Sequence, residues 1–195
     1  MHKIVFTAAS VAITFVFTLG ASIAHAQERG YAGLAIGTSK FGVTNGAGQR
    51  IEHNNNVIPL TGYAGYVLSE HFAVEGGYAG TSKKPRFDRA RFSAASDPQA
   101  HVSALYAAVR GKAAVSQSVD VFAKLGVAIT HFELAGAGAQ DFDVIAVRPM
   151  VGVGAAYRLT DKVALTAELE HYGRVREGKR SFMQNRAQVG IEFSF

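Results

Sequence analysis

Two side chains in the sequence have the types and the spacing of a catalytic pair. His101 and Ser103 are separated only by Val102, in a segment of alternating character. Side chains two residues apart in a strand point to the same face, so an imidazole at His101 would be able to activate the serine hydroxyl as a nucleophile. No neighbouring acid that would orient the imidazole is evident, and we interpret His101 as a residue at the edge of a loop.

Other chemistry finds little support in the composition. The 195 residues include no cysteine, which excludes disulfides and thiolate sites. The chain has no glycine-rich phosphate loop and no HExxH sequence. His131 and His171 lie near predicted strand ends, but no carboxylate spacing supports a metal site there. We therefore expect no catalytic residues, no metal and no cofactor.

Single charged residues set among glycines and apolar residues form a second group. They share one face of the alternating segments, and four are acidic and four basic: Glu75, Arg110, Lys124, Arg148, Glu168, Glu170, Arg186 and Glu192. An unpaired buried charge costs several kcal/mol, whereas a paired and hydrogen-bonded charge is tolerated. We predict that these residues pair inside the fold. Either the pairs hold the interior shut and fix the register, or they exchange partners and pass small ions.

Eight alternating segments are expected to position these charges. Alternation with a period of two predicts strands, and the segments cover residues 31–41, 58–68, 72–80, 101–114, 119–133, 144–158, 163–174 and 186–195. Short turns begin near residues 68, 115 and 159, whereas residues 42–56, 81–100, 134–143 and 175–185 are predicted long connections. Short turns at one rim and long loops at the other, joining strands of about ten residues, are typical of bacterial outer-membrane barrels.

The two faces of the segments differ in a way that indicates which one meets lipid. One face is apolar, and the other carries glycines and isolated charges. A water-soluble barrel would cover its outer face mainly with large charged residues, whereas glycine beside single charges fits the crowded interior of eight strands. We therefore predict charges inside and apolar side chains against lipid. Aromatic residues at the predicted strand ends indicate interfacial girdles: Tyr66, Phe72, Tyr157 and Phe195 at the short turns, and Phe41 and Phe132 toward the loops.

The first 26 residues read as a secretory signal peptide. Lys3 precedes an apolar stretch that ends in Ala24-His25-Ala26, a cleavage pattern. The alternative is an uncleaved N-terminal anchor. We predict a signal peptide over residues 1–26 and a barrel domain over residues 27–195. The signal holds one of the 20 basic residues and none of the 15 acidic ones, so the mature chain would carry a formal charge of +4.

The last eight residues resemble the C-terminal assembly signature of outer-membrane barrels. Polar and apolar residues alternate strictly to a terminal aromatic residue, and the signature positions are Gln188, Gly190, Phe193 and Phe195. A soluble β-sandwich that happens to end on phenylalanine is the alternative.

A broader resemblance covers the mature chain. Residues 62–80 (GYAGYVLSEHFAVEGGYAG), 118–127 (SVDVFAKLGV) and 152–173 (GVGAAYRLTDKVALTAELEHYG) look like the transmembrane domain of OmpA-type proteins. The resemblance implies an all-β, eight-stranded antiparallel up-and-down barrel in the outer membrane of a Gram-negative bacterium. It also implies a charge network across the lumen, with Glu75, Arg110, Lys124 and Glu170 in matching local motifs. Because the chain ends on the barrel, we do not expect the cell-wall tethering of longer members.

The predicted long connections suggest partners. Two of them are rich in basic residues, which are Lys83, Lys84, Arg86, Arg89, Arg91, Arg176, Lys179 and Arg180. Arginine suits bidentate contact with phosphate, so we expect contact with lipopolysaccharide and outer-membrane lipid, and with a polyanionic host or surface glycan. We also expect a monomer that the barrel assembly machinery recognises during biogenesis, and no nucleic-acid partner.

These observations predict a non-enzymatic barrel with a role in envelope integrity and surface interaction. Small barrel-only relatives include adhesins and immune-evasion surfaces. A small ion or solute pore is the first alternative. A lipid A-modifying enzyme is the second, because some small outer-membrane barrels are deacylases that use a histidine and a serine two residues apart, as His101 and Ser103 are.

Overall fold

A computed structural model gives the fold of residues 29–44, 50–81, 99–135, 142–177 and 180–195. Side chains are described for residues 29–39, 58–80, 102–131, 145–173 and 184–195. The strands are β1 (Gly30–Thr44), β2 (Arg50–Val57), β3 (Pro59–Val67), β4 (Phe72–Thr81), β5 (Gln99–Ala114), β6 (Val119–Ala135), β7 (Phe142–Arg158), β8 (Val163–Glu177) and β9 (Arg180–Ser194). Among the described residues, no helix is long and apolar enough to span a bilayer.

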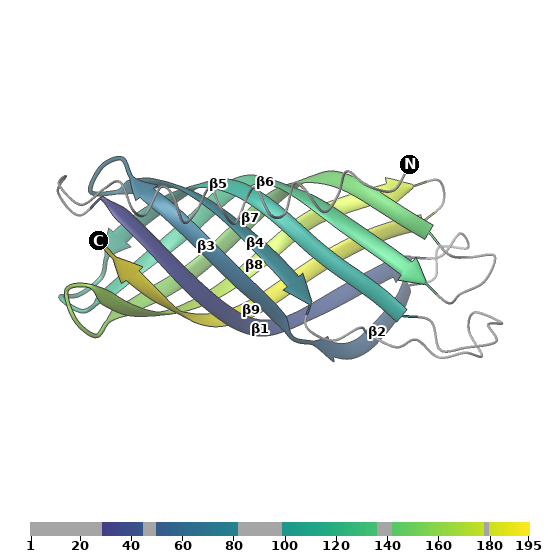
Figure 1. Ribbon diagram of the computed structural model, residues 1–195, viewed down its shortest axis with the longest axis horizontal. Coiled ribbons are helices and arrows are strands. Elements are labelled where there is room, and N and C mark those ends of the chain that lie inside the picture. The colour runs from purple at the N-terminus through teal and green to yellow at the C-terminus, as the bar shows by residue number, and fades with distance from the viewer. Residues whose placement is uncertain (1–28, 45–49, 82–98, 136–141, 178–179) are drawn as a thin grey trace.

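The strands close into an antiparallel barrel (Figure 1). Each strand from β3 to β8 pairs with the next, and β9 pairs with β1 from Tyr31↔Ser194 to Thr44↔Ser181. β2 and β3 are one wall strand interrupted at Ile58, since both pair with β1 on either side of that residue. The barrel therefore has eight strands, as the sequence predicted, and closure removes the sheet edges that would otherwise be unpaired in lipid.

The three predicted short turns are present, and they share one local construction. Each turn has a hydroxyl residue at its second position, and this side chain accepts a hydrogen bond from the first backbone N–H of the next strand. The pairs are Ser69 with Phe72 at 3.2 Å, Ser116 with Val119 at 3.1 Å and Thr160 with Val163 at 3.1 Å. Such side-chain bonds stabilise tight turns. All three turns lie at the end of the barrel where the chain ends (Figure 1).

Two of the long connections are shorter than predicted. Residues 42–56 were predicted as a connection, yet β1 continues to Thr44 and β2 begins at Arg50. Residues 175–185 were predicted as a loop, yet β8 continues to Glu177 and β9 begins at Arg180. The prediction followed the sustained apolar alternation, whereas the backbone pairing of β1 with β2 and of β8 with β9 continues beyond it.

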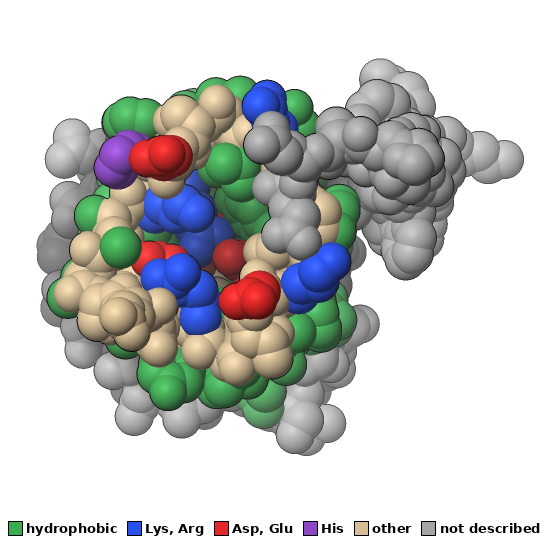
Figure 2. All heavy atoms as spheres, turned by 90° about the vertical axis from the view of Figure 1, so that its left-hand side faces the viewer, with side chains coloured by type: hydrophobic (Ala, Val, Ile, Leu, Met, Phe, Trp, Pro, Cys, Tyr) green, Lys and Arg blue, Asp and Glu red, His purple; other side chains and the backbone are tan. Residues whose placement is uncertain are grey.

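The orientation of the two faces is as predicted. Large apolar residues of the predicted lipid face are exposed, and Leu125, Val127, Val153 and Leu169 are examples. Viewed from the end with the short turns, hydrophobic side chains surround the barrel and charged side chains fill its interior (Figure 2). Tyr66, Phe72, Tyr157 and Phe195 are exposed near the short turns. The side chains of Phe41 and Phe132 lie outside the described ones.

Candidate functional site

The eight charged residues singled out in the sequence come from six strands and point into the lumen. Seven of them are buried, and Glu192 is half-buried. β4 carries Glu75, β5 carries Arg110, β6 carries Lys124 and β7 carries Arg148. β8 carries Glu168 and Glu170, and β9 carries Arg186 and Glu192. Alternation alone puts them on this face, because side chains two apart in a strand share a side.

Glycines beside aromatic rings make room for these charges. In the register, Tyr63 lies opposite Gly33, Tyr31 opposite Gly65, Tyr106 opposite Gly77 and Phe122 opposite Gly154. A Cβ atom at Gly77 would lie only 2.6 Å from the Tyr106 ring, so the ring occupies the space above the glycine. Glycine in a strand often marks such a close approach. Each ring therefore packs against the glycine on the neighbouring strand. The hydroxyls of the three tyrosines reach the carboxylates of Glu75 and Glu192.

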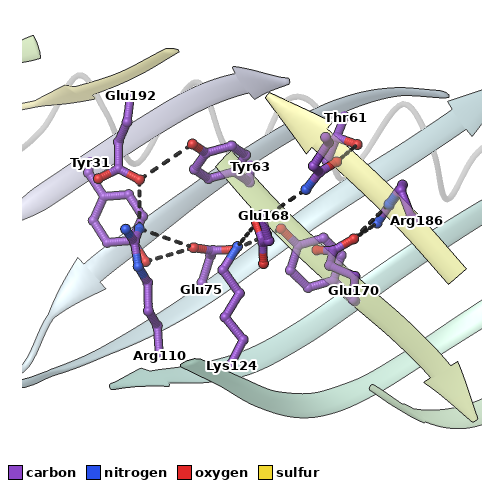
Figure 3. Close-up of polar contacts among 12 residues, drawn as sticks. Tyr31, Thr61, Tyr63, Glu75, Arg110, Lys124, Glu168, Glu170, Arg186 and Glu192 are labelled. Atoms are coloured by element: carbon purple, nitrogen blue, oxygen red, sulfur yellow. Dashed lines mark hydrogen bonds and ion pairs between the residues drawn. The ribbon is translucent and has the colours of Figure 1, made fainter. Parts of the chain in front are cut away.

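Glu75 is the centre of the network (Figure 3). Its carboxylate accepts hydrogen bonds from the Tyr31 hydroxyl at 2.9 Å and the Tyr106 hydroxyl at 2.7 Å. Lys124 Nζ lies 2.7 Å from the same carboxylate, and Arg110 Nη1 lies 3.6 Å away. Charge-assisted bonds of this kind are roughly twice as strong as neutral ones. Glu75 therefore joins β1, β4, β5 and β6 across the lumen.

Arg110 extends the network toward the short-turn end. Its Nη1 donates to Glu192 at 2.6 Å, and the Tyr63 hydroxyl donates to the same carboxylate at 3.4 Å. The guanidinium also stacks 4.0 Å from the centroid of the Phe122 ring, an arrangement that favours a cation over an aromatic face. Glu192 lies on β9, so this contact reaches the strand that closes the barrel.

Lys124 extends the network to the opposite wall. Its Nζ donates to Glu168 at 2.8 Å while also contacting Glu75, so one ammonium bridges two carboxylates. The side-chain amide of Gln188 donates to Glu168 at 3.2 Å, and Thr61 donates to Gln188 at 2.9 Å. Gln188, which the sequence placed in the assembly signature, therefore also belongs to the lumen.

A separate group lies nearer the loops. Arg186 Nε donates to Glu170 at 2.6 Å, and the Tyr172 hydroxyl donates to the same carboxylate at 3.1 Å. A second guanidinium nitrogen of Arg186 contacts the Tyr172 hydroxyl. This group is neutral as a whole. Glu168 and Glu170 each retain one buried carboxylate oxygen, Oε1, without a hydrogen-bond partner.

Arg148 is the predicted network residue that does not join it. Its side chain is only 6% exposed, and its Nε has no hydrogen-bond partner. No described acid forms an ion pair with it. The structure thus brings seven of the eight predicted charges into two ion-paired groups and leaves Arg148 outside both.

The basic loop residues predicted to meet polyanions lie largely outside the described part of the chain. Lys83, Lys84, Arg86, Arg89, Arg91 and Lys179 fall in the segments that are not described, and Arg176 and Arg180 are described only in their backbone. Arg176 lies near the end of β8 and Arg180 begins β9, at the rim opposite the three short turns. In the sequence, Lys179 falls between these two strands, and the other five residues fall between β4 and β5.

The suggested catalytic pair is only partly described. Ser103 lies on β5 opposite Gly80 and His131, and His101 lies opposite Glu133 in the backbone register. The side chains of His101 and Glu133 are outside the described set. His171 bonds Asn185 at 2.6 Å on the outer face. No group of three or more metal-ligating residues occurs in the described part of the chain.

Sequence reasoning missed the neutral members of the network. Tyr31, Tyr63, Tyr106, Tyr172 and Thr61 supply hydroxyls to the charged groups directly or through Gln188. The sequence could have indicated these residues, because each lies an even number of positions from an inward glycine or charged residue on its own strand. Tyr106 and Arg110 are one example, and Tyr172 and Glu170 are another. A tyrosine of lumen parity in an apolar-looking strand needs a hydrogen-bond partner when buried.

The comparison with protein families decides the identity of this barrel. The description of the matching family is "Outer membrane protein beta-barrel domain", and the match covers residues 9–195. The chain belongs to this outer-membrane β-barrel family. The predicted OmpA-type barrel, its transmembrane strands and its location in the outer membrane of a Gram-negative bacterium agree with this membership. The comparison with curated proteins gave no match.

Solved structures of other barrels share the fold. Neisserial surface protein A aligns with a TM-score of 0.59 and 14% identity, over 85% of this chain and 97% of that one. The N-terminal barrel of Pseudomonas aeruginosa OprF aligns with a TM-score of 0.58 and 12% identity, over 87% and 100%. The attachment invasion locus protein Ail of Yersinia pestis, in complex with the heparin analogue sucrose octasulfate, aligns with a TM-score of 0.53 and 12% identity, over 85% and 99%. At these identities the likeness concerns the fold.

Proposed function

We propose that this outer-membrane barrel supports envelope integrity through a lumen closed by ion pairs, and that its long connections form a surface for polyanions. The proposal of a closed lumen rests on the position of Lys124, whose Nζ lies 2.7 Å from the Glu75 carboxylate and 2.8 Å from the Glu168 carboxylate. All three side chains are buried. A bridge of this kind obstructs an interior that eight strands already make narrow.

The surface role rests on charge. The connections at the rim opposite the short turns, together with the adjoining ends of β8 and β9, carry the basic residues named above. That rim faces outward in the family's topology. Arginine and lysine there would meet lipopolysaccharide phosphates or the sulfates of a glycan. Ail, a barrel of the same fold, binds a heparin analogue. That complex supports a sulfated polyanion as a ligand class for this chain.

Two features support roles in biogenesis and lipid contact. Phe193 and Phe195 of the assembly signature are exposed on the outer face of β9 and at the end of the chain. They are accessible to the barrel assembly machinery before the last strand closes on β1. The apolar outer face then takes lipid as its permanent partner, and we expect the folded barrel to be a monomer.

A small pore is the second candidate. The unpartnered Oε1 atoms of Glu168 and Glu170 favour it, because they offer a neighbouring base an alternative carboxylate oxygen. The interior is also hollowed at the short-turn end, where charged side chains line the opening (Figure 2). A pore would need these pairs to exchange on the time scale of ion passage.

Planar-bilayer conductance separates the two candidates. We expect the purified barrel to show no steady single-channel current, and Glu170→Ala to change conductance because it leaves Arg186 without its carboxylate. A steady current through the unmodified barrel would favour the pore. An unchanged current and unchanged heat-modifiable gel mobility in Glu170→Ala would remove Glu170 from any role in closing the lumen.

Binding of fluorescent heparin to whole cells tests the surface role. Replacement of Lys83, Lys84 and Arg86 by glutamate should abolish most binding. The matched control replaces Lys112, Arg158 and Lys162 by glutamate, which makes the same change in net charge near the short-turn rim. If both triple variants lose binding equally, net charge and not the loop surface is responsible, and the surface proposal is wrong.

A further inference from the structure

Arg148 differs from the other three lumen bases in having no counter-ion. Arg110 pairs with Glu192, Lys124 with Glu75 and Glu168, and Arg186 with Glu170. Arg148 is 6% exposed and forms no ion pair with any described acid. Its Nε–H is unsatisfied, as is that of Arg110, but Arg110 has carboxylates beside its Nη1. Buried polar groups are nearly always hydrogen-bonded, and an exception points to a strained group or to a bound water or ion.

The layer below Arg148 separates it from the acids. On β7 the inward residues run from Arg148 through Met150 to Gly152, and Gly152 lies opposite Glu170. Met150 lies opposite Tyr172, and both side chains are 0% exposed. The Tyr172 hydroxyl is already engaged by Glu170 and Arg186. Four residues of strand correspond to about 13 Å, so along this wall the buried pair of Met150 and Tyr172, here called the Met150–Tyr172 layer, lies between Arg148 and Glu170.

The other described inward side chains near Arg148 are small and uncharged. Arg148 lies opposite Ala128 on β6, and the next inward residue of β6 toward the loops is Thr130, whose hydroxyl donates to the Ala146 carbonyl at 3.1 Å. Ala104 faces the lumen from β5. None of these side chains supplies a carboxylate, so they do not compensate the positive charge of Arg148.

We propose that Arg148 binds one tetrahedral oxyanion group, a phosphate or a sulfate, in the part of the lumen on the loop side of the Met150–Tyr172 layer. The planar fork of a guanidinium matches two oxygens of such a group, and the ligand supplies the negative charge that the described protein side chains do not. This site lies within the barrel and differs from the basic surface of the connections. The group is either a free inorganic ion or the terminal substituent of a sugar.

The test uses the refolded, full-length barrel in a zwitterionic detergent with chloride replaced by fluoride. Isothermal titration with inorganic phosphate, inorganic sulfate and sucrose octasulfate gives three affinities. Arg148→Met should weaken binding of the oxyanion by about ten- to a hundredfold, the range for losing hydrogen bonds to a charged group. The matched control is Arg158→Met, an arginine of the same strand at the short-turn rim, which should change the affinity less than about twofold.

The outcomes are distinct. Saturable binding of phosphate or sulfate that Arg148→Met removes identifies a site for free oxyanions, and binding of the sulfated sugar alone identifies a glycan substituent. A phosphate-induced shift of the Arg148 Nε–H resonance in labelled wild-type protein would mark the same site independently. Equal affinities for the wild type and Arg148→Met, or no saturable binding of any of the three probes, would overturn the proposal. Unfolding does not confuse the test, because removing an unpaired buried charge is not expected to destabilise the barrel.

Discussion

Adjacent residues of β6 have opposite environments. Leu125 is 66% exposed on the outer face, whereas Lys124 is 3% exposed and bridges two carboxylates in the lumen. In a water-soluble protein the two would exchange places. Here lipid solvates the apolar side chain, so burying it inside would gain little. The stability that distinguishes this fold therefore depends on polar contacts in the lumen and on the backbone pairing of a closed sheet.

The largest loss of folding stability is expected for a substitution in the lumen, at Glu75. Glu75→Ala removes the acceptor of Tyr31 and Tyr106 and one of the two carboxylates beside Lys124. Breaking a buried ion pair costs about 3–5 kcal/mol, and we expect that loss in urea unfolding from lipid vesicles. Glu75→Gln is the control, since it keeps hydrogen-bonding capacity and should lose less. A change below about 1 kcal/mol in Glu75→Ala would show that the lumen network contributes little.

A somewhat smaller loss of stability is expected for a charge placed on the outer face, at Leu125. Leu125→Arg places a charge against hydrocarbon near the middle of β6, and we expect it to lower the free energy of unfolding in vesicles by about 2–4 kcal/mol. Leu125→Ala removes apolar area without adding charge and should cost less. If arginine is tolerated there as well as alanine, the assignment of this face to lipid is wrong.

A smaller effect is expected from a methyl group placed under a lumen ring. Gly77→Ala would put a Cβ atom 2.6 Å from Tyr106, and overpacking of this kind costs about 1–3 kcal/mol. Its neighbour is a matched control, because a Cβ atom at Gly76 would meet its nearest atom at 3.6 Å. Gly76→Ala should be neutral or slightly stabilising in the same unfolding measurement. Equal effects at the two positions would mean that Tyr106 does not rest on Gly77.

The smallest effect is expected at Ser103, on the outer face. Ser103→Ala should leave the acyl composition of lipid A unchanged and should alter the free energy of unfolding by less than about 0.5 kcal/mol. Mass spectrometry of lipid A from cells that express each form measures the first quantity. If lipid A from cells with the wild type lacks an acyl chain that lipid A from cells with Ser103→Ala retains, the proposed non-enzymatic role is wrong and lipid A modification becomes the better candidate.

The alternation of the chain was sufficient to predict the wall of the barrel. It gave the short turns at residues 68–71, 115–118 and 159–162 and the face of each strand, because side-chain direction in a strand depends only on local parity. It could not predict where β2 and the start of β9 lie. Their residues show no sustained alternation of apolar and polar side chains, and their pairing depends on the neighbouring strand.

By itself, the sequence determined which residues face the lumen and which face lipid, and it identified the eight inward charges. Only the closed barrel decided their partners. Glu75 and Lys124 are 49 positions apart, and Arg110 and Glu192 are 82 positions apart. Whether such pairs meet depends on how the strands are staggered around the barrel when β1 joins β9. The register of β7 with β8 places the Met150–Tyr172 layer between Arg148 and Glu170. Equal numbers of acids and bases in the sequence therefore do not produce complete pairing in the fold.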